Sequence, residues 1–512
     1  YGLRGEATKM NLIKVIKSLF IPLVKNRRLI ISALIIIWFI YPFIHIYKVK
    51  LSEDSIEYVI PSGYADDISE LNKTKIKSKV ILKPDLDTAI KQLDSLTKLA
   101  KMRNISISIV GKKHSMGGQT INDNSLYLNL EKINHLEFDN KENLLTIGSG
   151  ATWIDAIYFL NKQKKSVHVM QSFSDFSIGG SISVNAHGWH PGAGPLGNTI
   201  KELLVYTPDQ GVTKCSPNLD NELFNLVIGG YGLYGIILEA KIKVVDNIKL
   251  KYSLNIINPD NYVNTYKYLI KNNPAINLIY GRLDVSYDNF LNEATINIYK
   301  SVSDEPINSI LNYKVNEFKR MVFRASVRSN YGKKLRWFLE KRITPLINNK
   351  ITTRNFILDD RSDLIKNKHQ SSVDILHEYF IPVSNVNNFI DGLKSILPNE
   401  KIDLLNITLR EVATDIVSMM HYARENVFGF VILFNQLKTE NHEIEMKQLT
   451  QQLINLFHKH KGVYYLPYRL HASSDQFHKQ YPMAKTAFSL KSKYDKAHIL
   501  KNKLYDKYYR SR

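Results

Sequence analysis

The chain has 512 residues, of which 44% are apolar and 11% aromatic, so it can bury a large core and we expect at least two domains. Charged residues make up 23% of the chain, and this composition excludes a disordered protein. The net charge of +21 indicates either an anionic partner or a surface that is lysine-rich throughout. No nucleic-acid-binding motif accompanies this charge, so we expect no nucleic-acid partner. Cys215 is the single cysteine, which excludes an intrachain disulfide and a cysteine-based metal cluster, and we expect no metal site.

An apolar stretch at residues 29–47 predicts a helix that crosses a membrane once. At about 1.5 Å per residue it spans roughly 28 Å, close to the ~30 Å hydrocarbon core of a bilayer. Basic residues are more frequent before the stretch than after it, which places residues 1–28 in the cytoplasm and the body of the protein outside it. We therefore expect a basic segment at 1–28, a membrane anchor at 29–47 and a polar linker at 48–77. A cleaved signal peptide and a twin-arginine export signal at 26–31 are the alternatives.

From Val80 onward, strand and helix patterns alternate. The predicted strands are 80–84, 105–110, 126–130, 144–147, 203–207 and 236–245, and the predicted helices are 86–103, 153–162 and 222–227. Past residue 248 the alternation changes. A basic, aromatic-containing helical stretch at 316–342 indicates either a surface that lies on anionic lipid or a solvated basic face.

Two glycine-rich loops each follow an apolar segment. The first is Gly111-Lys-Lys-His-Ser-Met-Gly-Gly-Gln119, and the second is Ile178-Gly-Gly-Ser-Ile-Ser-Val-Asn-Ala-His-Gly188. Successive backbone N–H groups in a glycine-containing turn form a concave nest for anions such as a pyrophosphate. The two loops together predict a large phosphate-bearing cofactor.

A third motif, Gly230-Tyr-Gly-Leu-Tyr-Gly235, matches the G-x-G-x-x-G pattern of dinucleotide-binding folds. That pattern requires a strand before it and a helix after it. Residues 236–245 are instead β-branched and alternate as a half-buried strand does. We therefore interpret the match as coincidental.

In this order, the motifs resemble the FAD-binding half of the vanillyl-alcohol oxidase superfamily, also called the p-cresol methylhydroxylase (PCMH) type. The matching features are Pro84 in the opening strand, a glycine loop ending in His114-Ser115, the loop ending in His187-Gly188, and a closing G-G-x-G-x-x-G-I at 229–236. Segments 405–412 and 491–498 match more weakly. The resemblance implies an α+β fold: a two-lobed PCMH-type FAD-binding domain at 78–247, a mixed α/β cap (substrate) domain at 248–455, and a C-terminal segment at 456–512 that returns to the flavin site.

The resemblance also implies which residues hold FAD. These are Gly111, Lys112, Lys113, His114, Ser115, Met116, Gly117, Gly118, Gln119, Gly179, Gly180, Ser181, Asn185, His187, Gly188, Gly230, Gly232, Gly235 and Ile236. The N–H groups of Lys112, Lys113, Ser115 and Met116 could cradle the diphosphate. His114 is either bonded covalently to the flavin or hydrogen-bonded beside it, and Lys113 replaces the second glycine of the family's Gly-x-Gly-His-Ser. His187 either contacts the cofactor or fixes its loop.

Two residues are candidates for catalysis. Arg410 matches an arginine that in related enzymes faces the substrate and the flavin N1–C2 region, where a cation stabilises the anionic reduced flavin, and a surface ion pair is the alternative. His471 is a candidate general base for an alcohol O–H, and a structural histidine is the alternative.

We therefore expect a membrane-anchored, FAD-dependent oxidase or dehydrogenase that moves a hydride from an alcohol-type carbon to flavin N5. The substrate classes are a sugar, a polyol, a lactone or a lipid-linked alcohol, and the electron acceptor is O2 or a quinone. Two alternatives are a reductase of the same fold that uses NAD(P)H and a non-catalytic, membrane-tethered binding protein.

Overall fold

The computed structural model describes residues 27–54 and 58–509, which fall into two compact units, 1–53 and 54–512. In the first unit, α2 (Arg27–Leu51) contains the predicted anchor 29–47, whereas nearly all of the predicted basic segment 1–28 lies outside the described residues. Among the helices that the structure describes, none combines the length and apolar character needed to cross a membrane. Most side chains of 29–47 also lie outside the described part, so the anchor stays a prediction.

Residues 58–77, expected to be part of a linker, are folded. β1 (Tyr64–Ala65) pairs antiparallel with β2 (Thr74–Lys75), and Asp66 and Asp67 between them are buried. The Asp67 carboxylate accepts hydrogen bonds from Ser69 and from the N–H of Gly118 at 2.8 Å. Polar composition indicated a linker here, but these polar groups bind one another and the first glycine loop instead of water.

A small parallel sheet forms the first lobe of the larger unit. Its order is β3 (Ser78–Ile81), β5 (Leu126–Asn129) and β4 (Ile107–Val110). α3 (Leu86–Arg103) connects β3 to β4 and buries Ala89, Leu93 and Ala100. It begins where Asp85 accepts the N–H of Thr88 and ends at Asn104, whose left-handed backbone (φ 49°) stops the helix.

The second lobe is a six-stranded antiparallel sheet of order β10-β9-β11-β7-β6, with β8 paired to β11. Its strands are β6 (Leu136–Asp139), β7 (Leu144–Gly148), β8 (Lys165–Val167), β9 (Ile200–Thr207), β10 (Gly211–Cys215) and β11 (Ile236–Asp246). Its helices are α4 (Trp153–Asn161), α5 (Ile178–Ser183) and α6 (Asn221–Val227). The Gly230–Gly235 motif follows α6 and precedes strand β11, so it lacks the strand-before, helix-after context of a dinucleotide-binding turn.

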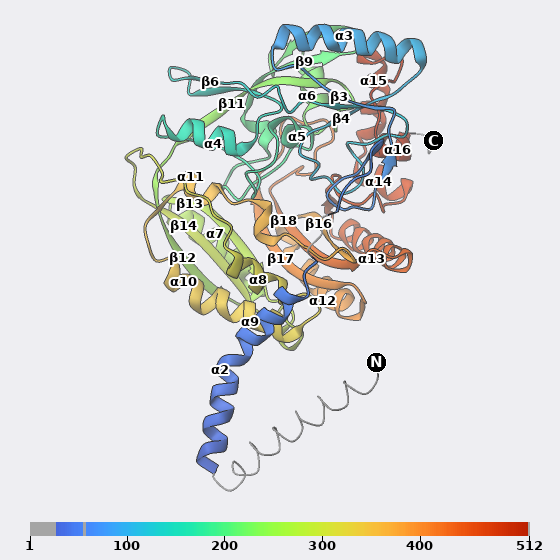
Figure 1. Cartoon of the computed structure of the whole chain (residues 1–512). Coiled ribbons are helices and arrows are strands. Elements are labelled where there is room, and N and C mark those ends of the chain that lie inside the picture. Colours follow the sequence, from blue (N-terminus) through green and yellow to red (C-terminus); the bar gives the residue numbers. More distant parts are fainter. Residues whose placement is uncertain (1–26, 55–57, 510–512) are drawn as a thin grey trace. The chain divides into compact units, whose positions relative to one another are not determined.

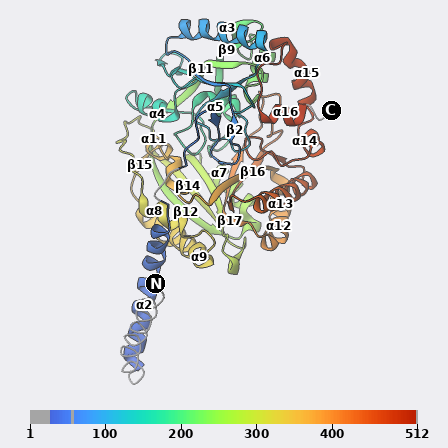
Figure 2. The ribbon, with the colours of Figure 1, turned by 45° about the vertical axis from the view of Figure 1, so that its right-hand side comes forward.

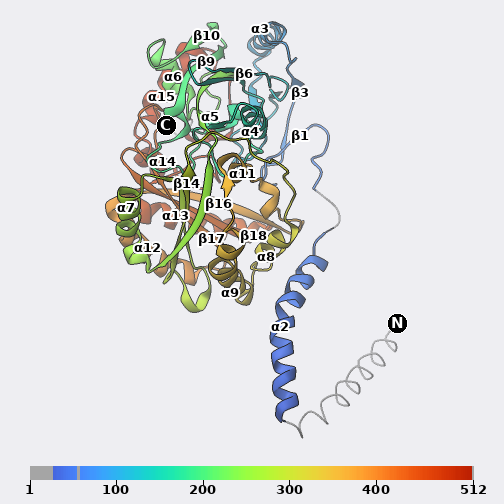
Figure 3. The ribbon, with the colours of Figure 1, turned by 90° about the vertical axis from the view of Figure 1, so that its left-hand side faces the viewer.

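An eight-stranded antiparallel sheet follows, of order β15-β12-β14-β13-β17-β18-β16-β19. Its strands are β12 (Lys249–Ile257), β13 (Ile276–Leu283), β14 (Ala294–Ser303), β15 (Thr352–Thr353), β16 (Ser372–Pro382), β17 (Asp403–Val412), β18 (Val427–Leu437) and β19 (Val463–Tyr464). Its helices are α7 (Tyr262–Asn272), α8 (Glu317–Arg324), α9 (Asn330–Phe338), α10 (Thr344–Ile347), α11 (Arg354–Leu358), α12 (Val386–Ile396) and α13 (Glu440–Lys459). Figures 1, 2 and 3 show this sheet at the opposite end of the unit from α3.

The end of the chain crosses back to the first lobe. It forms α14 (Ser474–Gln480), α15 (Ala484–Tyr494) and α16 (Lys503–Tyr509). The N–H of Ile107 in β4 donates to the carbonyl of Ile499 at 2.7 Å, and the N–H of Lys501 donates to the carbonyl of Ile107 at 3.0 Å. The mixed α/β architecture agrees with the expected fold class. Residues 54–512 are one compact unit, so the domain boundaries stay a prediction.

Candidate active site

One large cavity lies between the two lobes and the eight-stranded sheet. It has about 1490 Å³ of empty space including its open mouth. The lining residues come from both glycine loops, from the 231–237 turn, from β16 to β18 and from residues 465–468. Segments far apart in the sequence therefore meet at one cavity.

The first glycine loop leaves β4 and turns at once against the second. A side chain on Gly111 would place its Cβ 2.2 Å from the Ser177 hydroxyl, so any larger residue there would displace that hydroxyl. Lys113 has φ 64°, the left-handed backbone that glycine adopts freely and lysine only with strain. The loop thus keeps the backbone shape that a glycine would give it, although the residue is lysine.

Four consecutive backbone N–H groups of this loop are available to a ligand. No acceptor among the described residues binds the N–H of Lys112, Lys113, His114 or Ser115. The N–H of Met116, expected to join the cradle, donates instead to the carbonyl of Pro467 at 2.8 Å. The nest is therefore Lys112–Ser115.

Several side-chain polar atoms on the cavity wall also lack a partner in the described part of the protein. They are Ser115 Oγ, Ser149 Oγ, Gln171 Oε1 and Arg410 Nε. Buried polar groups nearly always have hydrogen-bond partners, so a set of unpaired groups around one cavity indicates a polar ligand. Hydroxyls, an amide and a guanidinium, together with the N–H nest, suit the diphosphate, ribityl chain and ring edges of FAD.

His114 lies on the cavity wall with its ring stacked on Phe176, the two centroids 3.7 Å apart and the planes 11° from parallel. Burial lowers the pKa of His114 to about 4, and Asp175 only partly opposes this. The imidazole is therefore neutral near pH 7, as both readings of this residue, the covalent and the hydrogen-bonded one, require.

A buried group of charged side chains lies on the wall formed by the eight-stranded sheet. His187 Nε2 lies 2.6 Å from Glu378 Oε1, and the Tyr468 hydroxyl donates to Glu378 Oε2 at 3.0 Å. His187 and Glu378 are 3% and 4% exposed. Burial opposes ionisation of Glu378, but His187, Arg410 and the Tyr468 hydroxyl together hold its pKa below its ordinary value. Glu378 is therefore a carboxylate at neutral pH.

Arg410, predicted as a catalytic residue, belongs to this group. It lies on β17 and lines the cavity, and its Nη2 donates to the Ser172 hydroxyl at 2.6 Å. Burial lowers its pKa while the charge of Glu378 raises it, and an arginine stays protonated in proteins. The cavity therefore holds a fixed cation beside a carboxylate.

Residues 88–216 match the protein family described as "FAD binding domain". The matched range includes both glycine loops. The chain is 29% identical over 158 residues to an uncharacterized oxidoreductase of the fasciation locus of Rhodococcoides fascians (30% of this chain, 36% of the relative). It is 28% identical over 175 residues to D-arabinono-1,4-lactone oxidase of Candida glabrata (33% of each chain). It is 23% identical over 397 residues to cytokinin dehydrogenase 5 of Arabidopsis thaliana (70% of each chain).

These matches confirm the predicted superfamily of FAD-linked oxidoreductases and FAD as the cofactor. The chain spans about a third of the length of the first two relatives.

Most of the residues expected to hold FAD line the cavity. They are Gly111, Lys112, Lys113, His114, Ser115, Gln119, Gly179, Gly180, Ser181, His187, Gly232 and Gly235. The others do not line it, namely Met116, Gly117, Gly118, Asn185, Gly188, Gly230 and Ile236. These support the loops instead: a Cβ on Gly117 would meet the Tyr468 carbonyl at 2.3 Å, and the Asn185 amide donates to Asp415 at 2.9 Å.

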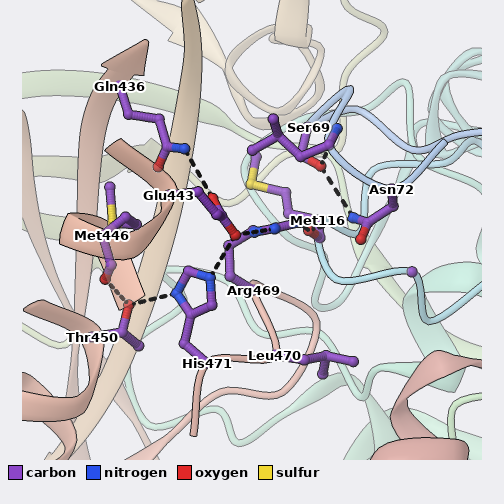
Figure 4. Close-up of polar contacts among 12 residues, drawn as sticks. Ser69, Asn72, Met116, Gln436, Glu443, Met446, Thr450, Arg469, Leu470 and His471 are labelled. Carbon is purple, nitrogen blue, oxygen red and sulfur yellow. Dashed lines mark hydrogen bonds and ion pairs between the residues drawn. The ribbon is translucent and has the colours of Figure 1, made fainter. Parts of the chain in front are cut away.

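His471, the second predicted catalytic residue, lies outside the cavity. Its Nε2 is 2.9 Å from Glu443 Oε1 and its Nδ1 is 2.9 Å from the Thr450 hydroxyl, so both ring nitrogens are occupied (Figure 4). Arg469 also pairs with Glu443, and it donates to the carbonyl of Met116 at 3.1 Å. The group therefore supports the first glycine loop at Met116, outside the cavity. His471 has no role in the proposed function.

Glu378 and Tyr468 were not found from the sequence. One signal was present, because Glu378 is the only carboxylate in the largely apolar and aromatic run 375–382, which also contains His377. A carboxylate is almost never fully buried without a partner. That rule predicts a partner for Glu378, but it does not say that the partner is His187, 191 residues earlier.

Proposed function

We propose that this chain is an FAD-dependent oxidoreductase that oxidises an alcohol-type carbon of a small molecule. The observation that carries the proposal is the buried group of Glu378, His187, Tyr468 and Arg410, which opens into the same cavity as the N–H nest and the unpaired polar atoms. Lys112–Ser115, Ser149 and Gln171 would hold FAD, which when bound supplies the hydride acceptor. The protein's own residues then have to bind the alcohol, take up its proton and balance charge.

In this proposal Glu378 accepts the hydroxyl proton of the substrate. A carboxylate has about four acceptor positions, and the bonds from His187 and Tyr468 use two of them. Glu131 is the other carboxylate on the described cavity wall, but it is exposed to solvent. His187 and Tyr468 fix the orientation of Glu378, so we assign them positioning roles.

Arg410 stabilises the negative charge that develops in the cavity during the reaction. Its guanidinium is held by Ser172 and its Nε has no protein partner, so it can meet an anionic group without reorganising. A preorganised cation in a water-poor site is worth more than the same cation in water. This role agrees with the one that the family resemblance implies.

The substrate classes stay those expected from the sequence: a sugar, a polyol, a lactone or a lipid-linked alcohol. The names of the relatives, a lactone oxidase and a dehydrogenase, support oxidation over reduction by NAD(P)H. The proposed electron acceptor is O2 or a quinone. The membrane anchor at 29–47, with the body on the non-cytoplasmic side, is part of the proposal and rests on the sequence alone.

The test uses the full-length, detergent-solubilised protein and its visible spectrum. We expect flavin bands, and we expect anaerobic bleaching by at least one of an aldonolactone, a polyol, a sugar and a prenol. Rapid bleaching by NADPH but by none of the alcohols would favour the reductase. A protein that is colourless and cannot be reconstituted with FAD would favour the non-catalytic binding protein.

We further propose that His114 is bonded covalently to the flavin, because its neutral ring lies on the cavity wall beside the nest. After acid precipitation, the yellow colour of the wild type should stay in the pellet, and that of His114→Ala should move to the supernatant. Phe176→Leu, which removes the stacked ring but keeps the histidine, is the matched control and should keep its colour in the pellet. If the colour leaves the pellet of the wild type, FAD is bound non-covalently.

A further inference from the structure

Nearly half of the net charge of this protein is concentrated in one segment of the cap. Residues 310–356 contain twelve Lys or Arg and two Glu, a net charge of +10 out of +21 for the whole chain. Five of these cations are buried inside the cap, namely Arg320, Arg324, Lys333, Arg336 and Arg354, so the other seven supply the charge at the surface. The segment includes α8, α9, the single π-helical turn Leu339–Ile343 and α10. Figures 1 and 3 show α9 at the end of the unit opposite α3.

The same segment exposes large apolar side chains. Leu346 is 74% exposed, Ile347 67% and Ile351 62%, and Phe318 and Phe338 are also exposed. The helices are nevertheless anchored in the cap, because α8 buries Met321 and Val322 and α9 buries Trp337. Each helix therefore packs one face on the protein and presents aromatic or aliphatic side chains on the other.

The exposed cations between these apolar residues are largely uncompensated. In the described part of the chain, no carboxylate pairs with Lys319, Arg342 or Lys350. Lys334 and Lys341 do form ion pairs, with Asp288 and Glu293. We call the exposed side chains of Phe318, Lys319, Phe338, Arg342, Leu346, Ile347, Lys350 and Ile351 the basic apolar surface.

We propose that the basic apolar surface lies on a bilayer that contains anionic lipids. Cations at the headgroup level and apolar side chains at the acyl boundary are the two features that interfacial helices combine. A soluble polyanion would satisfy the cations but would leave Leu346, Ile347 and Ile351 in water. Anionic lipid satisfies both kinds of side chain, and an exposed apolar patch of this kind marks an interaction site. The proposal depends neither on the flavin chemistry nor on residues 29–47.

The single cysteine allows a site-specific test. Cys215 is fully buried, and burial raises the pKa of its thiol to about 12, so it does not react with a thiol-directed dye near neutral pH. In a Leu346→Cys variant, a polarity-sensitive fluorophore then labels position 346 and no other position. The matched control is Met102→Cys on α3, because Met102 is 75% exposed and lies at the other end of the unit.

Both labelled full-length proteins are reconstituted into phosphatidylcholine vesicles with and without phosphatidylglycerol. We expect the dye at position 346 to shift to shorter wavelength and to be quenched by spin-labelled acyl chains in the anionic vesicles, and we expect high salt to reverse this. The dye at position 102 should show neither effect. Adding Arg342→Glu and Lys350→Glu to the Leu346→Cys protein should abolish the shift with the flavin spectrum unchanged.

Three results would overturn the proposal. One is a dye at position 346 that stays in water in anionic vesicles, and the second is an equal shift at positions 346 and 102. The third is a shift caused by heparin but not by vesicles, which would assign the surface to a soluble polyanion. Because the dye reports position and not activity, a protein without oxidase activity can still give the expected result.

Discussion

The described part of the protein contains two histidine–glutamate pairs of nearly the same geometry. In one, His187 Nε2 lies 2.6 Å from Glu378; in the other, His471 Nε2 lies 2.9 Å from Glu443. Each glutamate also has an arginine nearby: Arg410 lowers the pKa of Glu378, and Arg469 pairs with Glu443. The first pair lines the cavity, whereas the second lies outside it, with Glu443 31% exposed to solvent, and supports the loop at Met116.

The comparison shows that access, and not chemical type, separates a candidate catalytic group from a structural one. Both histidines have their nitrogens bonded, and both glutamates are held below their ordinary pKa by a histidine and an arginine. Only Glu378 has a cavity beside it where a substrate can reach it. Substitutions of the two pairs should therefore differ in kind: the first should change turnover and the second stability.

The largest effect is expected for Glu378→Gln. The amide keeps the size of the side chain but cannot accept the substrate proton, so the rate of anaerobic flavin reduction should fall by about 10²–10⁴-fold. Flavin content should be unchanged. Glu443→Gln is the matched control and should reduce its flavin at close to the wild-type rate. If Glu378→Gln reacts as fast as the control, Glu378 does not accept the proton.

The arginines give the next largest difference. Arg410→Gln removes a fixed cation from the cavity and should lower turnover by about 10²–10³-fold, the usual cost of losing one preorganised donor. It should also lower the reduction potential of the flavin, which dye-equilibration titration measures. Arg410→Lys keeps the charge and should recover part of the potential, and Arg469→Gln should leave the potential unaltered. A potential that is the same in all four proteins would mean that Arg410 does not act on the flavin.

The His471–Glu443 pair should make the free energy of unfolding depend on pH. Burial opposes the ionisation of Glu443, but His471 and Arg469 lower its pKa from 4.5 to about 2. A carboxylate with a depressed pKa stabilises the fold above its ordinary pKa, and this contribution is lost as the pH falls from 4.5 toward 2. Glu443→Gln should therefore cost about 1–3 kcal/mol of unfolding free energy at pH 7. Urea titrations should show the two proteins converging on acidification, and a constant difference at every pH would contradict the assigned pKa.

The sequence predicted the parts of the site that are local in the chain. The two glycine loops and the closing turn are short motifs, and residues of all three line the cavity. Glu378 and Tyr468 have no local motif, because the register of β16 and the return of the C-terminal segment bring them to His187. The polar composition of residues 58–77 predicted a linker, but Asp66 and Asp67 are buried there, and Asp67 binds the first loop. His471 was chosen by residue type, which does not reveal that both its nitrogens are bonded.

The smallest effect is expected at Lys113, where backbone and side chain act in opposite directions. The left-handed conformation costs a non-glycine residue about 1–2 kcal/mol, and the greater freedom of unfolded glycine offsets part of this. Lys113→Gly should therefore stabilise the protein by roughly 0.5–1 kcal/mol. Losing the cation on the cavity wall should at the same time weaken retention of FAD. Lys113→Ala separates the two contributions, because it loses the same charge and keeps the Cβ. When each substitution is combined with His114→Ala, we expect the two proteins to lose the same fraction of FAD on dialysis. Only the glycine variant should have a raised Tm. An equal Tm in the two would show that the loop is unstrained.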